Sequence, residues 1–340
     1  MPARHRASPL PPGDPGGGCP RIALPHSSHR TPRTRSTAVT PPAQAPAVPG
    51  SRRRRAVVVA LLPAAVLLGA CASEAPQQRA TSSAPAPSPA SALADISHVH
   101  GVGVDPADGS LFLATHEGLF QLTDGGGAAL VSPVMDLMGF SVAGPGHFLA
   151  SGHPGLEVDL PQPMGLIEST DSGRTWSPVS RQGQSDFHAL TTSSVGVLGY
   201  DGDLLRSGDG QDWEQLSIPS EPHSLTTSSD GQLVLATTAQ GLLRSADAGS
   251  TWSAVDGAPL LQVVDWADDG MDVAGVDPSG AVWTSSDGGI SWTAGAALGS
   301  EPQAVAVSSA PGGLRVTVVT TAAVLESSDG GRTFDALLEP

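Results

Sequence analysis

The residues of this sequence best suited to chemistry are histidines, and seven of them lie between residues 95 and 340. Imidazole is the commonest protein ligand of transition metals. Because that range contains no cysteine, a thiolate site is excluded, and three or four imidazoles would suit Zn²⁺ or Cu²⁺. A neighbouring thioether would favour copper. The candidate metal ligands are His98, His100, His116, His153, His188 and His223, with Met138 as a further candidate.

The elements that must position these histidines are indicated by a recurring peptide. An octapeptide of the form Ser-x-Asp-x-Gly-x-Thr-Trp occupies residues 169–176, 245–252, 285–292 and 327–334. A copy one residue short lies at 207–213, and a decayed copy without Ser or Trp lies at 122–127. Successive Asp residues are 47, 38, 38, 40 and 42 positions apart, at Asp124, Asp171, Asp209, Asp247, Asp287 and Asp329. A near-constant period of this length indicates a repeat architecture.

Each copy of the octapeptide lies between two short apolar runs, a pattern typical of a β-hairpin. The Asp carboxylate can accept hydrogen bonds from the N–H groups of its own turn, and Gly supplies the positive φ angle. In the first unit, strands are expected at 98–104, 111–115, 119–122 and 128–131. Six such units predict an all-β, six-bladed β-propeller of four-stranded antiparallel blades.

The octapeptide resembles the Asp-box (BNR) repeat of sialidases, sortilin-like receptors and related β-propellers. That resemblance implies a structural turn on the side away from the functional face. The opening His98-Val99-His100-Gly101 is also similar to a group of bacterial exported propellers described as glycosyl-hydrolase-like. This second resemblance extends over residues 95–340 and carries over no catalytic residue.

The histidines fall at corresponding places in the units. The starts of the first strands hold His100, Met138, His188, His223, Gln262 and Gln303. The ends of the second strands hold His116, His153, Tyr200, Thr238, Val276 and Thr320. His98 projects to the same side as His100, because side chains two residues apart share one face of a strand. Both sets are expected at the channel mouth opposite the Asp-box turns. There they would either fill and hydrate the channel or bind a metal ion.

An enzymatic function is the first alternative. Sialidase chemistry requires an arginine cluster and a Tyr–Glu pair. The sole tyrosine, Tyr200, has no Glu aligned beside it, and four arginines lie in or just before the Asp boxes, at Arg174, Arg206, Arg244 and Arg332. A sialidase is therefore not expected. A carbohydrate-active hydrolase that uses two carboxylates in catalysis is still a possible function, because several acids are expected near the His-bearing end of the propeller: Asp136, Glu157, Asp159, Asp186 and Glu221. A protein-interaction or assembly scaffold is the second alternative.

The region before the repeats has a different character. Residues 1–50 contain little apolar surface, which predicts either disorder or an extension upstream of the true start. Residues 51–71 read as a lipoprotein signal peptide, with four arginines, an apolar run and a lipobox-like ending at Cys71. Residues 72–94 form an Ala/Pro/Ser-rich tether, and the propeller occupies 95–340. Export and anchoring to the outer face of the cytoplasmic membrane through lipidated Cys71 are expected.

The net charge of residues 71–340 limits the kinds of molecule that the protein can bind. Residues 71–340 carry seven Arg, no Lys and 32 Asp and Glu, a formal charge of −25. This balance excludes a nucleic-acid surface and opposes docking of the domain on anionic lipid. The expected protein is a monomer whose partner is a small ligand, a glycan or another protein.

Overall fold

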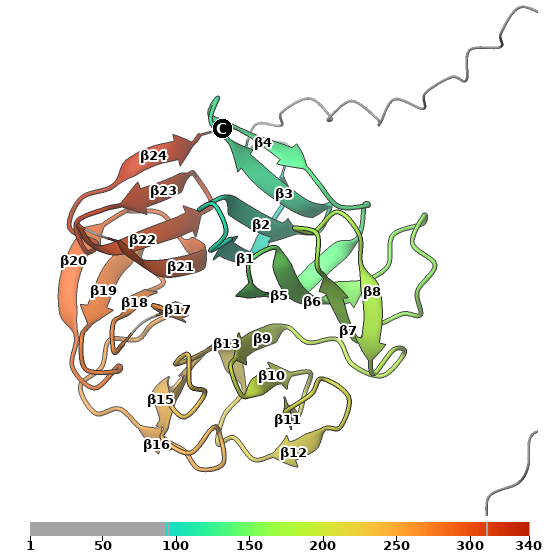
Figure 1. Ribbon diagram of the computed structural model, residues 1–340. Helices are drawn as coiled ribbons and strands as arrows, with labels where there is room; N and C mark the ends of the chain where they lie inside the picture. The colour runs from blue at the N-terminus through green and yellow to red at the C-terminus, as the bar shows by residue number, and fades with distance from the viewer. Residues whose placement is uncertain (1–92, 94–95, 269, 311, 340) are drawn as a thin grey trace, which may run out of the picture. The chain divides into compact units, whose positions relative to one another are not determined.

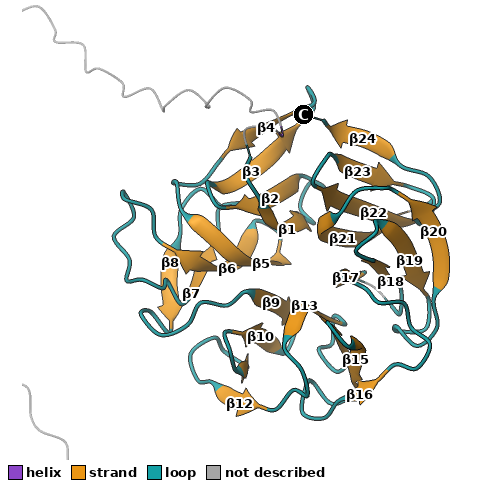
Figure 2. Ribbon diagram, turned by 180° about the vertical axis from the view of Figure 1, so that it is seen from behind, coloured by secondary structure: helices purple, strands orange, loops and turns teal. Residues whose placement is uncertain are grey.

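The computed structural model describes residues 93, 96–268, 270–310 and 312–339, and these residues form an all-β protein. Six four-stranded antiparallel sheets are arranged around a central channel (Figures 1 and 2). Within each sheet, the strands pair in sequence order, so every blade is a simple meander. The predicted six-bladed β-propeller is therefore confirmed.

The first three blades contain β1–β4 (Val99–Val104, Leu111–Thr115, Gly118–Thr123, Gly127–Leu130), β5–β8 (Asp136–Gly144, His147–His153, Leu166–Ser169, Ser177–Ser180) and β9–β12 (Ala189–Ser193, Gly196–Tyr200, Leu204–Ser207, Glu214–Leu216). The other three contain β13–β16 (Pro222–Thr227, Val234–Thr238, Gly241–Ser245, Ser253–Ala254), β17–β20 (Val263–Trp266, Val273–Val276, Ala281–Ser285, Thr293–Ala297) and β21–β24 (Pro302–Ala310, Gly313–Thr320, Val324–Ser327, Asp335–Leu338). The four strands expected in the first unit are all present, with ends shifted by at most one residue.

Side-chain hydrogen bonds hold the repeated turns. Before β8, the backbone N–H and hydroxyl of Thr175 donate to the Asp171 carboxylate at 2.9 and 2.7 Å. Ser169 Oγ accepts from the Gly173 N–H at 2.8 Å, and the Trp176 indole donates to the Gly173 carbonyl at 2.9 Å. Equivalent carboxylate contacts recur at Asp247, Asp287 and Asp329. The expectation that Asp fixes each turn through the turn's own N–H groups is borne out in these copies.

The two imperfect copies differ from the others. Asp209 accepts from the N–H groups of Gln211 and Asp212, at 2.8 and 2.9 Å. The decayed copy at Asp124 shows no such side-chain hydrogen bond among the described residues, although its chain still turns through Gly126. The hairpin geometry therefore persists where the carboxylate network has been lost.

The first strand of each blade contacts the first strand of the next blade around the ring. Glycine permits the close approach between the second and third blades. A Cβ atom on Gly139 of β5 would lie 2.4 Å from the carbonyl oxygen of Phe187 and 3.0 Å from Cβ of Leu190. Real side chains do not fit at such a distance, so a residue without a side chain is required there.

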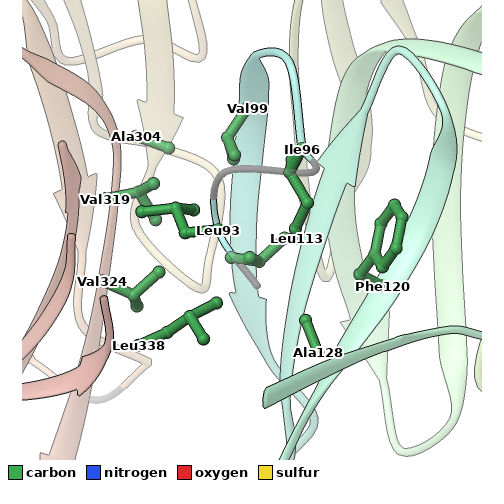
Figure 3. Packing of buried hydrophobic residues seen from close by; sticks show 10 residues of the cluster. All are labelled: Leu93, Ile96, Val99, Leu113, Phe120, Ala128, Ala304, Val319, Val324 and Leu338. Carbon is green, nitrogen blue, oxygen red and sulfur yellow. The ribbon is translucent and has the colours of Figure 1, made fainter. Parts of the chain in front are cut away.

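Apolar packing closes the ring between the last blade and the first. Since every sheet of the described residues consists of consecutive strands, none of these strands completes a blade at the other end of the chain. Instead, a buried cluster joins Leu93, Ile96, Leu113 and Phe120 on one side to residues of the last blade on the other, namely Ala304, Val319, Val324 and Leu338 (Figure 3). The segment just before β1 thus contributes to closure.

No helix among the described residues is long and apolar enough to cross a membrane. The extension 1–50, the signal peptide 51–71 with Cys71, and the tether 72–94 lie outside the described residues, except for Leu93.

Candidate functional site at the channel mouth

The channel forms a cavity of about 950 Å³ between the first strands of all six blades. Five of the seven candidate metal ligands line this cavity: His98, His100, Met138, His188 and His223. The remaining two candidates, His116 and His153, lie at the mouth, just after β2 and at the end of β6. All seven candidate ligands are therefore at the expected end of the propeller.

β-Bulges determine how the residues at the starts of the first strands are presented. In four blades the strand register skips one residue, and the skipped residue is His100, Met138, His223 or Gln303. In the third blade, the His188 N–H donates to the Tyr200 carbonyl at 3.0 Å just ahead of β9. A bulge leaves one residue unpaired and redirects its side chain. The same backbone irregularity therefore delivers these side chains to the channel.

Three imidazoles of the first blade form a compact cluster. The ring centroids of His98 and His100 are 4.7 Å apart, and those of His100 and His116 are 4.5 Å apart. Nε2 of His100 lies 3.2 Å from Nε2 of His116. Nδ1 of His98 lies 2.8 Å from the side-chain amide of Gln303, which comes from the last blade. The cluster thus spans the junction where the ring closes.

A second set of contacts extends the cluster along the rim into the second and third blades. Nδ1 of His116 lies 2.8 Å from Oδ1 of Asp136, and Nδ1 of His153 lies 3.4 Å from Oδ2 of the same carboxylate. Nε2 of His153 then lies 3.1 Å from Oδ2 of Asp186. Nε2 of His188 lies 3.7 Å from that same oxygen. Imidazoles and carboxylates therefore alternate across three blades.

Burial and mutual repulsion favour the neutral form of three imidazoles that line the channel. Partial burial, followed by the positive charges of His116 and His98, lowers the pKa of His100 to about 4. Burial, followed by the charge of His116, also lowers the pKa of His98. Burial lowers the pKa of His223. Neutral imidazole nitrogens have lone pairs available, which is the form that a metal ion requires.

The predicted residues are not all brought together. Ligand atoms of His100, His116 and Asp136 lie within 4.8 Å of one another, close enough to hold one metal ion. His153 and His188 join this group only through carboxylates. No hydrogen bond or ion pair links His223 to the others within the described part of the chain. His147, the one histidine of residues 95–340 that is not a candidate ligand, lies at the opposite end of β6, where Nε2 is 3.4 Å from Glu168.

The carboxylates are the site residues that the sequence reasoning did not assign. Asp136 and Asp186 were recognised only as acids near the His-bearing end. Each lies two residues before the position that delivers a side chain to the channel, as Glu221 and Glu301 also do. His98 occupies this place in the first blade. Aligning that position across the units would have shown four acids in six blades and indicated a carboxylate-rich rim.

No protein-family model and no curated protein matches this chain. Among solved structures, a gluconolactonase from Xanthomonas campestris matches 65% of this chain and 82% of its own, with a TM-score of 0.52 and 11% identity. An ancestral GH74 enzyme matches with a TM-score of 0.48 and 12% identity, covering 70% of this chain but only 37% of the enzyme. YCF48 bound to a D1 peptide matches with a TM-score of 0.40 and 17% identity, over 60% of this chain and 67% of that chain. The gluconolactonase match shows a shared propeller fold, and identities this low transfer no activity.

Proposed function

We propose that the protein binds a divalent transition-metal ion at its channel mouth, through His100, His116 and Asp136. The observation that carries this proposal is the convergence of three ligand atoms from three separate strand ends within 4.8 Å. The bound ion would replace the proton shared by Nδ1 of His116 and Oδ1 of Asp136, which lie 2.8 Å apart. Nε2 of His100 lies 3.5 Å from the same Nδ1 atom and would supply the third ligand.

The ligand types indicate which metals would bind. Imidazole nitrogen and carboxylate oxygen without thiolate suit Zn²⁺ and Cu²⁺. His98 stands within 4.7 Å of the His100 ring and is the nearest further imidazole. Met138 lines the same cavity, and its thioether would favour copper if it approached the ion. The lipid anchor predicted at Cys71 would present this site outside the cytoplasmic membrane.

The test is the metal content of the full chain, purified without a polyhistidine tag and incubated with Zn²⁺ or Cu²⁺ before desalting. Wild-type protein is expected to retain at least one equivalent of the ion, measured by plasma mass spectrometry. His100→Ala should lose at least 10-fold in affinity, because loss of even an outer-shell partner typically costs a metal site 10–100-fold.

His147→Ala is the matched control. His147 is a partly exposed histidine of the second blade, but it lies beside Glu168 at the other end of the propeller. Its substitution should leave the metal content unchanged. Equal metal content in wild-type and His100→Ala protein would overturn the proposal, and so would wild-type protein that retains no metal.

A further inference from the structure

We infer that a second divalent metal ion binds beside the first, held by Nε2 of His153, Nε2 of His188 and the carboxylate of Asp186. This inference extends the proposed function without depending on it, because these three ligands are distinct from His100 and His116. The three residues come from the end of β6 and from the segment just before β9, so they bridge the second and third blades.

The proton positions of the two histidines point to a cation between them. Nδ1 of His188 lies 3.0 Å from the backbone carbonyl of Asp186, and Nδ1 of His153 lies 3.4 Å from the carboxylate of Asp136. A carbonyl and a carboxylate only accept, so both Nδ1 atoms carry the protons. In the neutral rings, both Nε2 atoms therefore direct lone pairs towards Asp186. Metal-binding histidines characteristically donate the other ring N–H to a carbonyl or carboxylate in this way.

Two of the three ligand–ligand distances suit one ion, whereas the two imidazole nitrogens lie more than 4.8 Å apart, so the exposed His188 ring would have to turn towards His153. Nε2 of His153 and Nε2 of His188 lie 3.1 and 3.7 Å from the same oxygen, Oδ2 of Asp186. Two ligand atoms bound to a tetrahedral Zn²⁺ at about 2.0 Å are roughly 3.3 Å apart. One proton between His153 and Asp186 would satisfy a single nitrogen–oxygen pair. A metal ion would satisfy both nitrogens and the carboxylate together.

Asp186 also has unused coordinating capacity. Its Oδ1 atom is buried and has no hydrogen-bond partner, although the side chain as a whole is 20% exposed. A buried carboxylate oxygen without a donor is costly, and a cation bound by the carboxylate would offset that cost. His188 has a side chain that is 58% exposed, which leaves an ion free to enter from solvent.

Asp136 connects the two sites. Its Oδ1 lies beside His116 of the first site and its Oδ2 beside His153 of the second. One carboxylate would thus bind the first ion and orient a histidine of the second site, and Asp136 and His153 face each other across β5 and β6 as register partners. A pair of ions along the rim is the expected loaded state.

The experiment counts Zn²⁺ ions on the full chain. Protein stripped with EDTA is titrated with Zn²⁺ at pH 7.5, desalted and measured by plasma mass spectrometry. Wild-type protein should retain two equivalents. Asp186→Asn and, separately, His188→Ala should each retain one, and His100→Ala should also retain one. The exposed position of His188 makes its substitution structurally mild, and circular-dichroism melting verifies that each variant folds.

The outcomes separate the second site from the first. One equivalent in the wild type that disappears in His100→Ala but persists in Asp186→Asn would overturn this inference and leave the proposed function standing. One equivalent that disappears in Asp186→Asn and His188→Ala but persists in His100→Ala would support the second site and overturn the first. No zinc in the wild type would overturn both proposals. The imidazoles and carboxylates of the rim would then be linked by protons and not by metal ions.

Discussion

At the scale of single residues, hydrogen-bond partners decide which nitrogen of a histidine ring carries the proton. On the rim, groups that only accept hydrogen bonds fix Nδ1 of His153 and His188 as donors and leave their Nε2 atoms facing Asp186. Deeper in the channel, burial has a larger effect on the pKa of Asp265, in β17, than the hydrogen bonds that its carboxylate accepts. Its carboxylate accepts from the Val307 N–H at 2.8 Å and from the Thr226 hydroxyl at 3.1 Å. Burial nevertheless raises the pKa of Asp265 to about 7.

Asp265 should therefore make stability depend on pH. Its folded-state pKa is raised above the unfolded value of 3.8, so its contribution is greatest below about pH 4 and is lost as pH rises through 7. Asp265→Asn, which resembles the protonated acid, should remove this loss. Between pH 5 and 8, the free energy of unfolding of the wild type should fall by about 2–3 kcal/mol relative to the variant.

Urea unfolding at the two pH values measures this difference. The carboxylates of the repeated turns do not interfere, because the pKa of Asp287, for example, is lowered to about 2 by hydrogen bonds from Ser291. Parallel pH profiles for wild type and variant would mean that Asp265 is already ionised in the folded protein at pH 5.

At the scale of elements, two features of the first strands work together. In the first and second blades, a bulge at the start of the strand sends one side chain to the channel, and a glycine directly after the bulge lets the next blade approach. Gly101 follows His100 in this way, and Gly139 follows Met138. The glycine therefore belongs to the packing between blades, while the bulged residue belongs to the site.

Gly139→Ala tests the packing role. The added Cβ would lie 2.4 Å from a backbone oxygen that has no freedom to rotate away, so the second and third blades would have to separate. Overpacking of this kind costs about 1–3 kcal/mol, and thermal melting should show the loss. Gly144→Ala is the control, because it lies in the same strand and its Cβ would meet nothing within 4 Å. Equal melting temperatures for the two variants would contradict the close-packing explanation.

At the scale of the whole molecule, the propeller depends on one junction that the repeats do not build by themselves. Consecutive blades are joined by the chain, but the last and the first are joined by side chains. The His98–Gln303 contact at 2.8 Å crosses this junction at the mouth of the channel. Loosening the junction should therefore disturb both stability and the first metal site.

Ile96→Ala is the corresponding substitution. Ile96 is 7% exposed within the closing cluster (Figure 3), and truncating a buried isoleucine to alanine costs about 2–5 kcal/mol. Chemical denaturation of the full chain measures this loss. Ile290→Ala removes the same atoms from a side chain that is 56% exposed and should cost almost nothing. If Ile96→Ala were equally harmless, closure would not depend on the segment before β1.

The sequence by itself determined the blade number, the meander of each blade and the end at which the histidines gather. Those features follow from a repeated turn and from the alternation of short apolar runs, which are local in the chain. Aligning the starts of the first strands placed His100 and His188 correctly on the channel wall, because equivalent positions in a repeat occupy equivalent places in space.

Only the tertiary structure decided which of these residues act together. The sequence predicted one site of six histidines. In the structure, His116 and His153 contact Asp136, His153 and His188 contact Asp186, and His223 contacts neither carboxylate. Contacts such as His98 with Gln303, or His153 with Asp186, join different blades. Their distances depend on how blades pack and on bulges of a single residue, and neither is encoded in a local pattern. Ring closure brings the two ends of the repeat array together, and that contact exists only in the folded propeller.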